Sequence, residues 1–256
     1  MYVESRDGSR IAYWRQGSGE PVICIGGSLD DGTENQPVAE ALTQRFDVIN
    51  YSRRGRGEST DLGQSALRDE LCDLQALAAL FDRPPHLFGA STGGALALRA
   101  VIAGVPVGKV AVYEVPFDID PGAVDRQAAY VERMNKYLDA GDNDGALANF
   151  MRLAGSSEEE IQSGPNHPEW QRSAALAPSL RHDAEVLGDM RPPLSELQTL
   201  RTSILFLTGG SVPMFEKAAD AMSEAALRGQ RRVIQGQGHI ADPKVLAGAI
   251  SDWLEA

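Results

Sequence analysis

The stretch Leu87-Phe88-Gly89-Ala90-Ser91-Thr92-Gly93-Gly94 decides the fold that we expect for the whole chain. A short apolar run over residues 86–88 leads into Gly-x-Ser-x-Gly, and a helix-forming run over 95–100 follows at once. This strand–turn–helix pattern predicts a sharp turn with Ser91 in strained backbone geometry. Small neighbours are needed because bulkier side chains would collide across the turn. The Ser91 hydroxyl is therefore the first candidate for a reactive group.

The bulk composition is that of an ordinary globular protein, with 43% hydrophobic and 23% charged residues among 256. This length predicts one α/β domain, or one domain with an insertion. A formal net charge of −12 argues against binding nucleic acid or an anionic membrane surface. The N-terminus carries no apolar signal segment, and Cys24 and Cys72 fall in an expected strand and helix. We therefore expect a cytoplasmic protein with reduced, core-packing thiols.

Outward from Ser91, strand patterns and helix patterns alternate along the chain. The expected strands are 10–16, 21–25, 46–51, 86–88, 109–113, 203–207 and 231–234. The expected helices of this part are 69–81, 95–100, 215–227 and 243–254. Alternation of this kind predicts a mostly parallel sheet with right-handed crossovers.

The alternation stops in the middle of the chain, where no convincing strand pattern occurs. Helical patterns cover 124–138, 144–153, 158–162 and 169–187, and Pro192-Pro193 marks a return to the core. We expect a core formed by residues 1–116 and 191–256, and a helical cap formed by 117–190. Four large apolar residues lie in this cap or at its end: Met134, Met151, Trp170 and Met190. Two interpretations stay open: these side chains line an apolar substrate pocket, or they only pack the helices together.

A serine hydroxyl is a weak nucleophile, so Ser91 requires a general base nearby. His239 follows the last expected strand, at the carboxyl end of the sheet where open parallel sheets bind ligands. His86 lies at the opposite end of its strand, and His167 and His182 lie in the cap. His239 is therefore the predicted base.

A catalytic histidine is normally oriented by a carboxylate. The loop after the strand 203–207 reads Thr-Gly-Gly-Ser-Val-Pro and contains no acid. Glu114 directly follows the strand 109–113 at the same end of the sheet, which makes it the predicted acid. Asp118 and Asp183 stay as alternatives, and Glu114 could instead anchor the start of the cap.

Acyl-transfer chemistry also requires donors for a developing oxyanion. We expect one to be the backbone N–H of Thr92. The other is expected in the loop Gly26-Gly27-Ser28-Leu29-Asp30, from Ser28 N–H or, second, Gly27 N–H. An ordinary tight turn is the alternative for this loop. No cluster has metal-ligand spacing, and no phosphate-binding lysine loop or dinucleotide fingerprint is present, so we expect no cofactor and no metal.

Together these features resemble the α/β-hydrolase superfamily over essentially the whole chain. The stretch Asn50-Tyr51-Ser52-Arg53-Arg54-Gly55-Arg56-Gly57-Glu58-Ser59 is similar to the family's Asp-x-Arg-Gly-x-Gly-x-Ser loop. The resemblance implies an eight-stranded, mostly parallel sheet with a lid. Tyr113-Glu114-Val115-Pro116 is similar to the branch whose acid follows the sixth strand, as in haloalkane dehalogenases. Those enzymes use an aspartate nucleophile, so Ser91 places this chain on the esterase side.

The chain departs from the family pattern at three places. Gly26-Gly27 stands where the family has His-Gly, Ser52 replaces the aspartate before the arginine loop, and the acid after the seventh strand is missing. The first two departures change how the oxyanion loop is braced, and the third requires Glu114 to act instead. Arg53, Arg54 and Arg56 could form an anion-binding patch, but the negative net charge favours a structural role.

The sequence thus predicts a cofactor-independent serine hydrolase with Ser91, His239 and Glu114 as its triad. Its expected partner is a small to medium, largely apolar substrate, and the protein is expected to be a monomer or homodimer. One alternative is acyl transfer, C–C cleavage or perhydrolysis at the same site. Another is a ligand-binding protein without turnover, which the altered oxyanion loop and missing acid suggest.

Overall fold

A single eight-stranded sheet forms the centre of the computed structural model, which describes residues 1–63 and 66–256. The strands follow the order β1-β2-β4-β3-β5-β6-β7-β8. Pairing is antiparallel between β1, β2 and β4, and parallel from β4 through β8. The strands are β1 (Tyr2–Glu4), β2 (Arg10–Gly17), β3 (Glu20–Ile25), β4 (Phe46–Tyr51), β5 (His86–Ala90), β6 (Val110–Tyr113), β7 (Ile204–Thr208) and β8 (Gly229–Val233). The predicted mostly parallel sheet is confirmed.

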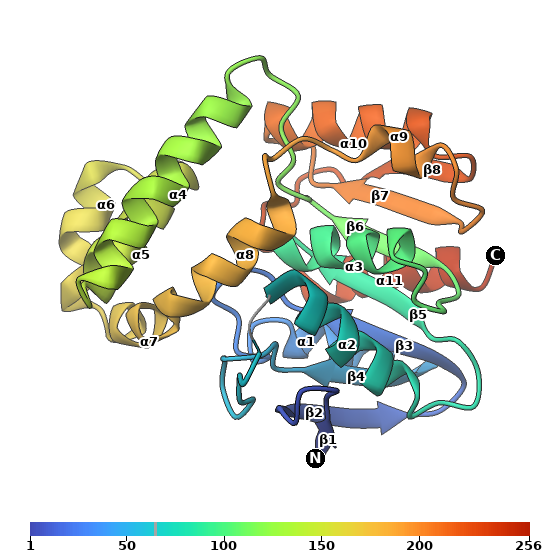
Figure 1. Ribbon diagram of the computed structural model, residues 1–256. Helices are drawn as coiled ribbons and strands as arrows, with labels where there is room; N and C mark the ends of the chain where they lie inside the picture. Colours follow the sequence, from blue (N-terminus) through green and yellow to red (C-terminus); the bar gives the residue numbers. More distant parts are fainter. Residues whose placement is uncertain (64–65) are drawn as a thin grey trace.

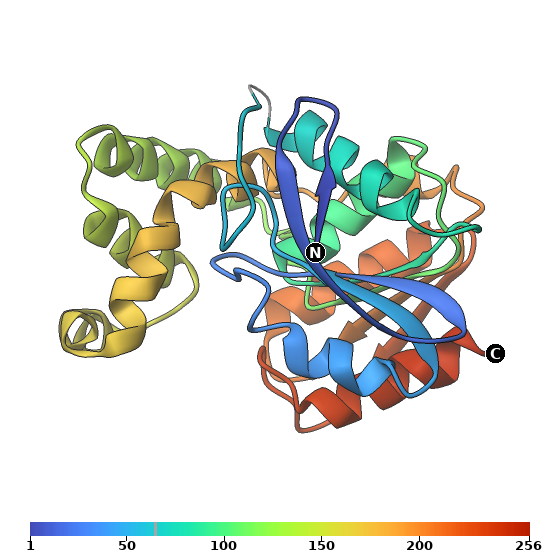
Figure 2. The same ribbon diagram turned by 90° about the horizontal axis from the view of Figure 1, so that it is seen from below.

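Helices cover both faces of this sheet (Figures 1 and 2). Apolar side chains of α2, α3 and α10 pack on one face, and those of α1 and α11 pack on the other. These helices are α1 (Gln36–Leu42), α2 (Ala66–Ala78), α3 (Thr92–Ile102), α10 (Pro213–Ala225) and α11 (Pro243–Leu254). Because the central strands are covered twice, every residue of β6 and β7 is buried, which explains their continuous apolar sequences.

The chain between β6 and β7 leaves the sheet and forms helices at one side of it (Figure 1). These inserted helices are α4 (Ala123–Asp139), α5 (Asn143–Leu153), α6 (Glu158–Ser163), η1 (Gly164–Asn166), α7 (Pro168–Leu176), η2 (Ala177–Ser179) and α8 (Leu180–Leu187). A short α9 (Leu194–Leu197) follows before β7. Within the described residues, no strand lies between 117 and 203, as the sequence predicts.

Some predicted elements require correction. The single helix predicted over 169–187 is wrong, because the 3-10 turn η2 separates α7 from α8. Pro178 in that turn lacks the N–H that an uninterrupted helix would need. The sequence reading also missed β1, α1 and α9, which are short elements. Among the described residues, no helix is both long and apolar enough to cross a membrane.

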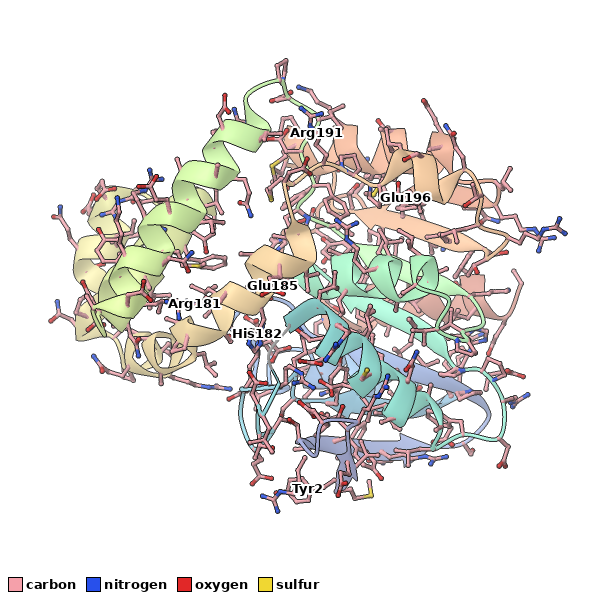
Figure 3. The ribbon with its side chains drawn as sticks, viewed as in Figure 1. Tyr2, Arg181, His182, Glu185, Arg191 and Glu196 are labelled. Carbon is pink, nitrogen blue, oxygen red and sulfur yellow. The ribbon has the colours of Figure 1, made fainter. Side chains whose placement is uncertain are left out.

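Helix α8 lies at the border between the inserted helices and the core, and Figure 3 labels His182 and Glu185 on it. His182 Nε2 lies 3.1 Å from Asp61 Oδ2, in the loop after β4. Glu185 Oε2 accepts a hydrogen bond of 3.3 Å from the backbone N–H of Leu67 in α2. Polar contacts therefore hold α8 against two different parts of the core.

Candidate active site

Ser91 lies at the sharp turn between β5 and α3, with φ 53° and ψ −127°. Its backbone N–H donates to the carbonyl of Tyr113 at the end of β6, at 2.9 Å. Its own carbonyl accepts from the N–H of Gly94 at 3.0 Å, in the first turn of α3. The Ser91 backbone is thus held from both sides, and this anchoring maintains a conformation that L-residues rarely adopt.

The glycines around Ser91 are required by close backbone contacts. A Cβ added to Gly89 would lie 2.4 Å from the carbonyl oxygen of Gly93. A Cβ added to Gly93 would lie 2.2 Å from the carbonyl oxygen of Ile25, the last residue of β3. Helix α3 can approach the sheet this closely only without those side chains.

Glu114 and His239 are brought together by two different loops at the carboxyl end of the sheet. Glu114 follows β6 with φ 46°, and its backbone N–H donates to Leu207 of β7 at 3.0 Å. His239 belongs to the loop between β8 and α11, and its Nδ1 lies 2.8 Å from Glu114 Oε2. The carboxylate is buried, with the residue only 1% exposed. This contact leaves the other ring nitrogen, Nε2, available for proton transfer.

Gly209, in the loop after β7, satisfies the second oxygen of Glu114. Its backbone N–H donates to Glu114 Oε1 at 2.9 Å. A Cβ on Gly209 would lie 2.0 Å from the carbonyl oxygen of Gln237 and 3.0 Å from the Tyr113 hydroxyl oxygen. The loop that contains no acid therefore supplies a hydrogen-bond donor to the acid of the neighbouring loop.

The His239 ring also stacks on Phe215, in the first turn of α10. The two ring centroids lie 5.1 Å apart, and the planes are inclined by 12°. The His239 side chain is 46% exposed, so one side of the ring is open to solvent. Within the described chain, the Ser91 hydroxyl makes no hydrogen bond to His239. Catalytic hydrogen bonds of this type are often long in unliganded enzymes and shorten when substrate binds.

Ser28 and Thr92, the two predicted oxyanion residues, lie side by side. Their hydroxyl oxygens are 3.2 Å apart. Thr92 is the first residue of α3, so its backbone N–H has no acceptor within the helix. Gly27 packs directly on Ser91, because an added Cβ would lie 3.1 Å from Ser91 Cβ. The loop after β3 therefore lies against the serine turn, as an oxyanion site requires.

The two alternative acids lie in other surroundings. Asp118 Oδ2 accepts from Arg126 at 2.6 Å, at the start of the inserted helices. Asp183 Oδ1, in α8, accepts from Arg53 at 2.8 Å and from Arg56 at 2.7 Å. Neither carboxylate contacts His239 in the described residues. Geometry thus pairs His239 with Glu114.

The arginines after β4 form buried ion pairs rather than an exposed patch. Arg53 binds Glu70 through Nε and Nη2 at 2.7 and 2.5 Å, and Arg54 binds Asp73 at 2.9 and 2.7 Å. Burial alone would raise the pKa of Asp183, but Arg56 and Arg53 outweigh it and hold that pKa below its usual value. Cys24 is buried, and burial raises the pKa of its thiol.

The structure shows several contributors that sequence reasoning missed. Phe215 and Gly209 carry no motif, because their roles depend on contacts between loops far apart in the chain. The contacts of Arg53 and Arg56 with Asp183 join positions more than 120 residues apart. The arginine-rich loop itself was a signal, since charges with a structural role need partner carboxylates.

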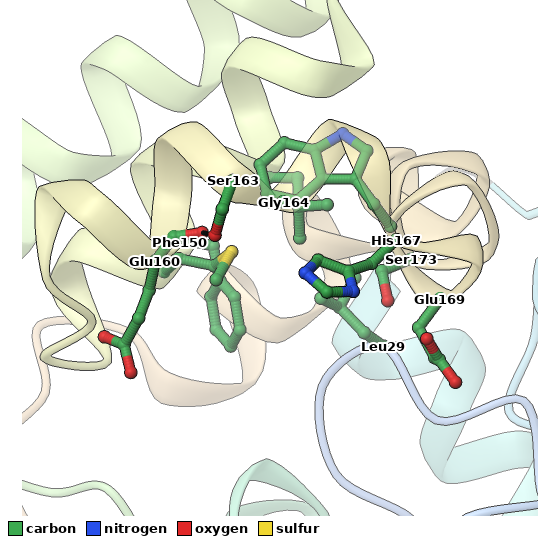
Figure 4. A pocket seen from close by; sticks show the side chains of 11 residues that line it. Leu29, Phe150, Glu160, Ser163, Gly164, His167, Glu169 and Ser173 are labelled. Atoms are coloured by element: carbon green, nitrogen blue, oxygen red, sulfur yellow. Dashed lines mark hydrogen bonds between the residues drawn. The ribbon is translucent and has the colours of Figure 1, made fainter.

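A cavity of about 470 Å³ lies among the inserted helices (Figure 4). Leu29, the residue after Ser28, forms part of its wall, and His167 and Glu169 are among its polar lining. Its apolar lining consists of Leu29, Leu147, Phe150, Met151 and Trp170. Of the four apolar residues singled out from the sequence, Met151 and Trp170 line this cavity, whereas Met134 and Met190 pack in hydrophobic clusters.

Comparisons with known proteins agree with this architecture. A structure of an alpha/beta hydrolase from Sphaerobacter thermophilus DSM 20745 superposes with a TM-score of 0.88 at 29% identity, covering 99% of this chain and 100% of that one. A thermophilic esterase from Thermogutta terrifontis superposes with a TM-score of 0.74 at 22% identity, covering 100% of this chain and 97% of that one. At 22% identity, the likeness to the esterase shows a shared fold and no more.

Among curated proteins, the uncharacterized hydrolase YraK of Bacillus subtilis (strain 168) is 30% identical over 99 residues. That match covers 37% of this chain and 36% of YraK, so it spans about a third of the relative. The family model of the alpha/beta hydrolase family matches residues 22–249, from β3 into the last helix. The chain belongs to the alpha/beta hydrolase family.

Proposed function

We propose that the protein is a cofactor-independent serine hydrolase that cleaves an ester or similar acyl bond through an acyl-enzyme. The contact of 2.8 Å between Glu114 Oε2 and His239 Nδ1 carries this proposal. It joins a buried carboxylate to a partly exposed imidazole, at the end of the sheet where Ser91 occupies its strained turn. A nucleophile, a base and an acid in this arrangement match the requirements for acyl transfer.

In this mechanism Ser91 Oγ attacks the substrate carbonyl carbon while His239 Nε2 takes the hydroxyl proton. The backbone N–H groups of Thr92 and Ser28 stabilise the oxyanion that forms. His239 then returns the proton to the leaving alcohol as the bond to the acyl carbon breaks. A water, deprotonated by His239, then attacks the acyl carbon. The bond between that carbon and Ser91 Oγ breaks, His239 returns the proton to Ser91 Oγ, and the acid is released.

We further propose that residues 117–190 act as a cap that selects a small to medium, largely apolar substrate. The cavity of about 470 Å³ supports this, because apolar side chains line it and Leu29 connects it to the oxyanion loop. A cavity of that volume lies within the range common for small-molecule sites.

The decisive experiment is labelling with a fluorophosphonate, followed by peptide mass spectrometry. We expect one adduct per chain on Ser91, none on Ser91→Ala, and turnover of short-chain p-nitrophenyl esters by the wild type only. A folded wild-type protein that neither reacts with the probe nor hydrolyses activated esters would disprove the proposal. Tight ligand binding without turnover would instead favour a binding protein.

A further inference from the structure

The oxyanion loop, residues 26–29, has few side chains of its own that could hold a donor in one direction. It begins with two glycines, and Leu29 has φ 60°. The carboxylate of Asp30 occupies the space beside Gly26, since an added Cβ there would lie 2.2 Å from Asp30 Oδ2. A side chain at position 26 therefore cannot brace this loop.

Two buried guanidinium groups hold the carbonyls of the loop instead. Arg56 Nη1 donates to the carbonyl oxygen of Gly27 at 2.5 Å. Arg53 Nη1 lies 3.4 Å from the carbonyl oxygen of Gly26 and 3.4 Å from the Thr92 hydroxyl. Both arginines are only 1% exposed, so these contacts are shielded from water.

The Gly27 carbonyl belongs to the same peptide unit as the Ser28 N–H. A trans peptide is planar, and its C=O and N–H point in opposite directions. Because Arg56 fixes the carbonyl, it also fixes the direction of the N–H on the other side. A cation on the oxygen polarises the amide as well, which strengthens the N–H as a donor.

Arg56 is itself held by the inserted helices. Its Nη2 donates to Asp183 Oδ1 at 2.7 Å, and Arg53 Nη1 donates to the same oxygen at 2.8 Å. Asp183 lies in α8, within the segment that leaves the sheet after β6. A continuous path of contacts thus runs from α8 through Arg56 to the peptide that ends in the Ser28 N–H.

We infer that Arg56, anchored by Asp183 of α8, is the positioning residue that orients the Ser28 N–H toward the oxyanion. This inference rests on the proposed function and names the support of its oxyanion site. It also makes the docking of α8 a condition for full transition-state stabilisation, because the anchor of Arg56 comes from that helix.

The test compares p-nitrophenyl acetate with its thionoester, in which sulfur replaces the carbonyl oxygen. An oxyanion site favours the oxygen ester, since N–H donors bind a developing sulfur anion less well. For Arg56→Gln and Asp183→Asn we expect kcat/KM for the oxygen ester to fall by about 10–100-fold, mainly through kcat. The thionoester rate should fall by less than about 3-fold, so the oxygen-to-sulfur ratio falls by at least about 3-fold.

The matched control is Asp73→Asn, which breaks the buried pair with Arg54 in the same arginine loop. Asp73 makes no contact with residues 26–29 in the described chain, so this variant should lose stability and keep the ratio of the wild type. A folded Arg56→Gln with an unchanged ratio would overturn the inference, as would an equal fall in Asp73→Asn.

Should Arg56→Gln fail to fold, Arg56→Lys serves in its place. A lysine keeps the charge but cannot bind the Gly27 carbonyl and Asp183 through two separate nitrogens. The oxygen-to-sulfur ratio of Arg56→Lys should therefore be lower than that of the wild type. A folded Arg56→Lys with the wild-type ratio would contradict the inference. A wild type without esterase activity or Ser91 labelling would instead count against the proposed function, which separates the two failures.

Discussion

Three non-glycine residues with positive φ surround the candidate site: Leu29 at 60°, Ser91 at 53° and Glu114 at 46°. Among the described residues only Met190 shares this property, at the end of the inserted helices. Each such residue costs on the order of 1–3 kcal/mol and persists only where surrounding contacts enforce it. Backbone strain is therefore concentrated at the turns that follow β3, β5 and β6.

Substitution of Glu114 by Gln removes the charge and places an amide N–H against His239 Nδ1. Two donors cannot share that contact, so the ring is driven into the tautomer that blocks proton uptake at Nε2. We expect kcat to fall by about 10²–10⁴-fold with little change in KM. Steady-state ester hydrolysis measures this, with Asp118→Asn as the control. Comparable loss in Asp118→Asn would contradict the assignment of the acid.

Substitution of Gly27 by Ala crowds Ser91 directly. The new Cβ would lie 3.1 Å from Ser91 Cβ and 3.7 Å from its hydroxyl oxygen, so the serine or the oxyanion loop has to move. A small displacement of reacting groups is costly, and we expect kcat/KM to fall by about 10–100-fold. Circular dichroism should show an intact fold. Wild-type kinetics in this variant would mean that the loop tolerates displacement.

At the scale of elements, the central strands were predictable because burial on both faces leaves a continuous apolar sequence, as in β7. The short helix α1 and strand β1 were not predictable, since so few residues show no clear period in their hydrophobic pattern. The pairing of Glu114 with His239 followed from placing both at one end of the sheet. The stacking of Phe215 did not, because only the packing of α10 brings that ring to His239.

Helix α11 offers a stability prediction that does not involve the site. Gly248 lies in its interior, and an added Cβ meets no atom within 4 Å. Gly248→Ala should stabilise the protein by about 0.5–1 kcal/mol, because glycine loses more backbone entropy in a helix. For a domain of this size that raises Tm by about 1–4 °C. Thermal unfolding followed by circular dichroism tests this, and a lower Tm would show an unforeseen contact.

At the scale of the whole molecule, carboxylates join the inserted helices to the core. Asp31, after β3, pairs with Arg172 of α7, and Asp183 of α8 pairs with Arg53 and Arg56. Burial would raise the pKa of Asp31, but the hydrogen bonds from Arg172 and Thr33 and the charge of Arg172 together outweigh it and hold that pKa below its usual value. Both carboxyl groups thus have a lower pKa in the folded protein than in the unfolded chain.

These lowered pKa values predict how stability depends on pH. A carboxyl group of this kind contributes stability that is present above its unfolded pKa, near 3.8, and lost as pH falls through its folded pKa. We therefore expect Tm to fall steeply below about pH 4. Urea unfolding at several pH values around pH 4 gives the slope of the free energy of unfolding against pH. This slope should be shallower in Asp183→Asn because one linked proton is gone. An identical slope would argue against the contribution of Asp183.

Gly209, whose backbone N–H donates to Glu114, lies where no larger residue fits without a shift of its neighbours. An acid at position 209 would need a Cβ 2.0 Å from the carbonyl oxygen of Gln237, and Gly210 has φ 85° with Val233 Cγ1 2.9 Å from its Cβ position. An acid at position 209 therefore requires the loop that contains Gln237 to shift, and an acid at position 210 requires a strained backbone and a shift of Val233. Engineering an acid into the loop after β7 at these two positions therefore has to begin with the residues that crowd them, Gln237 and Val233.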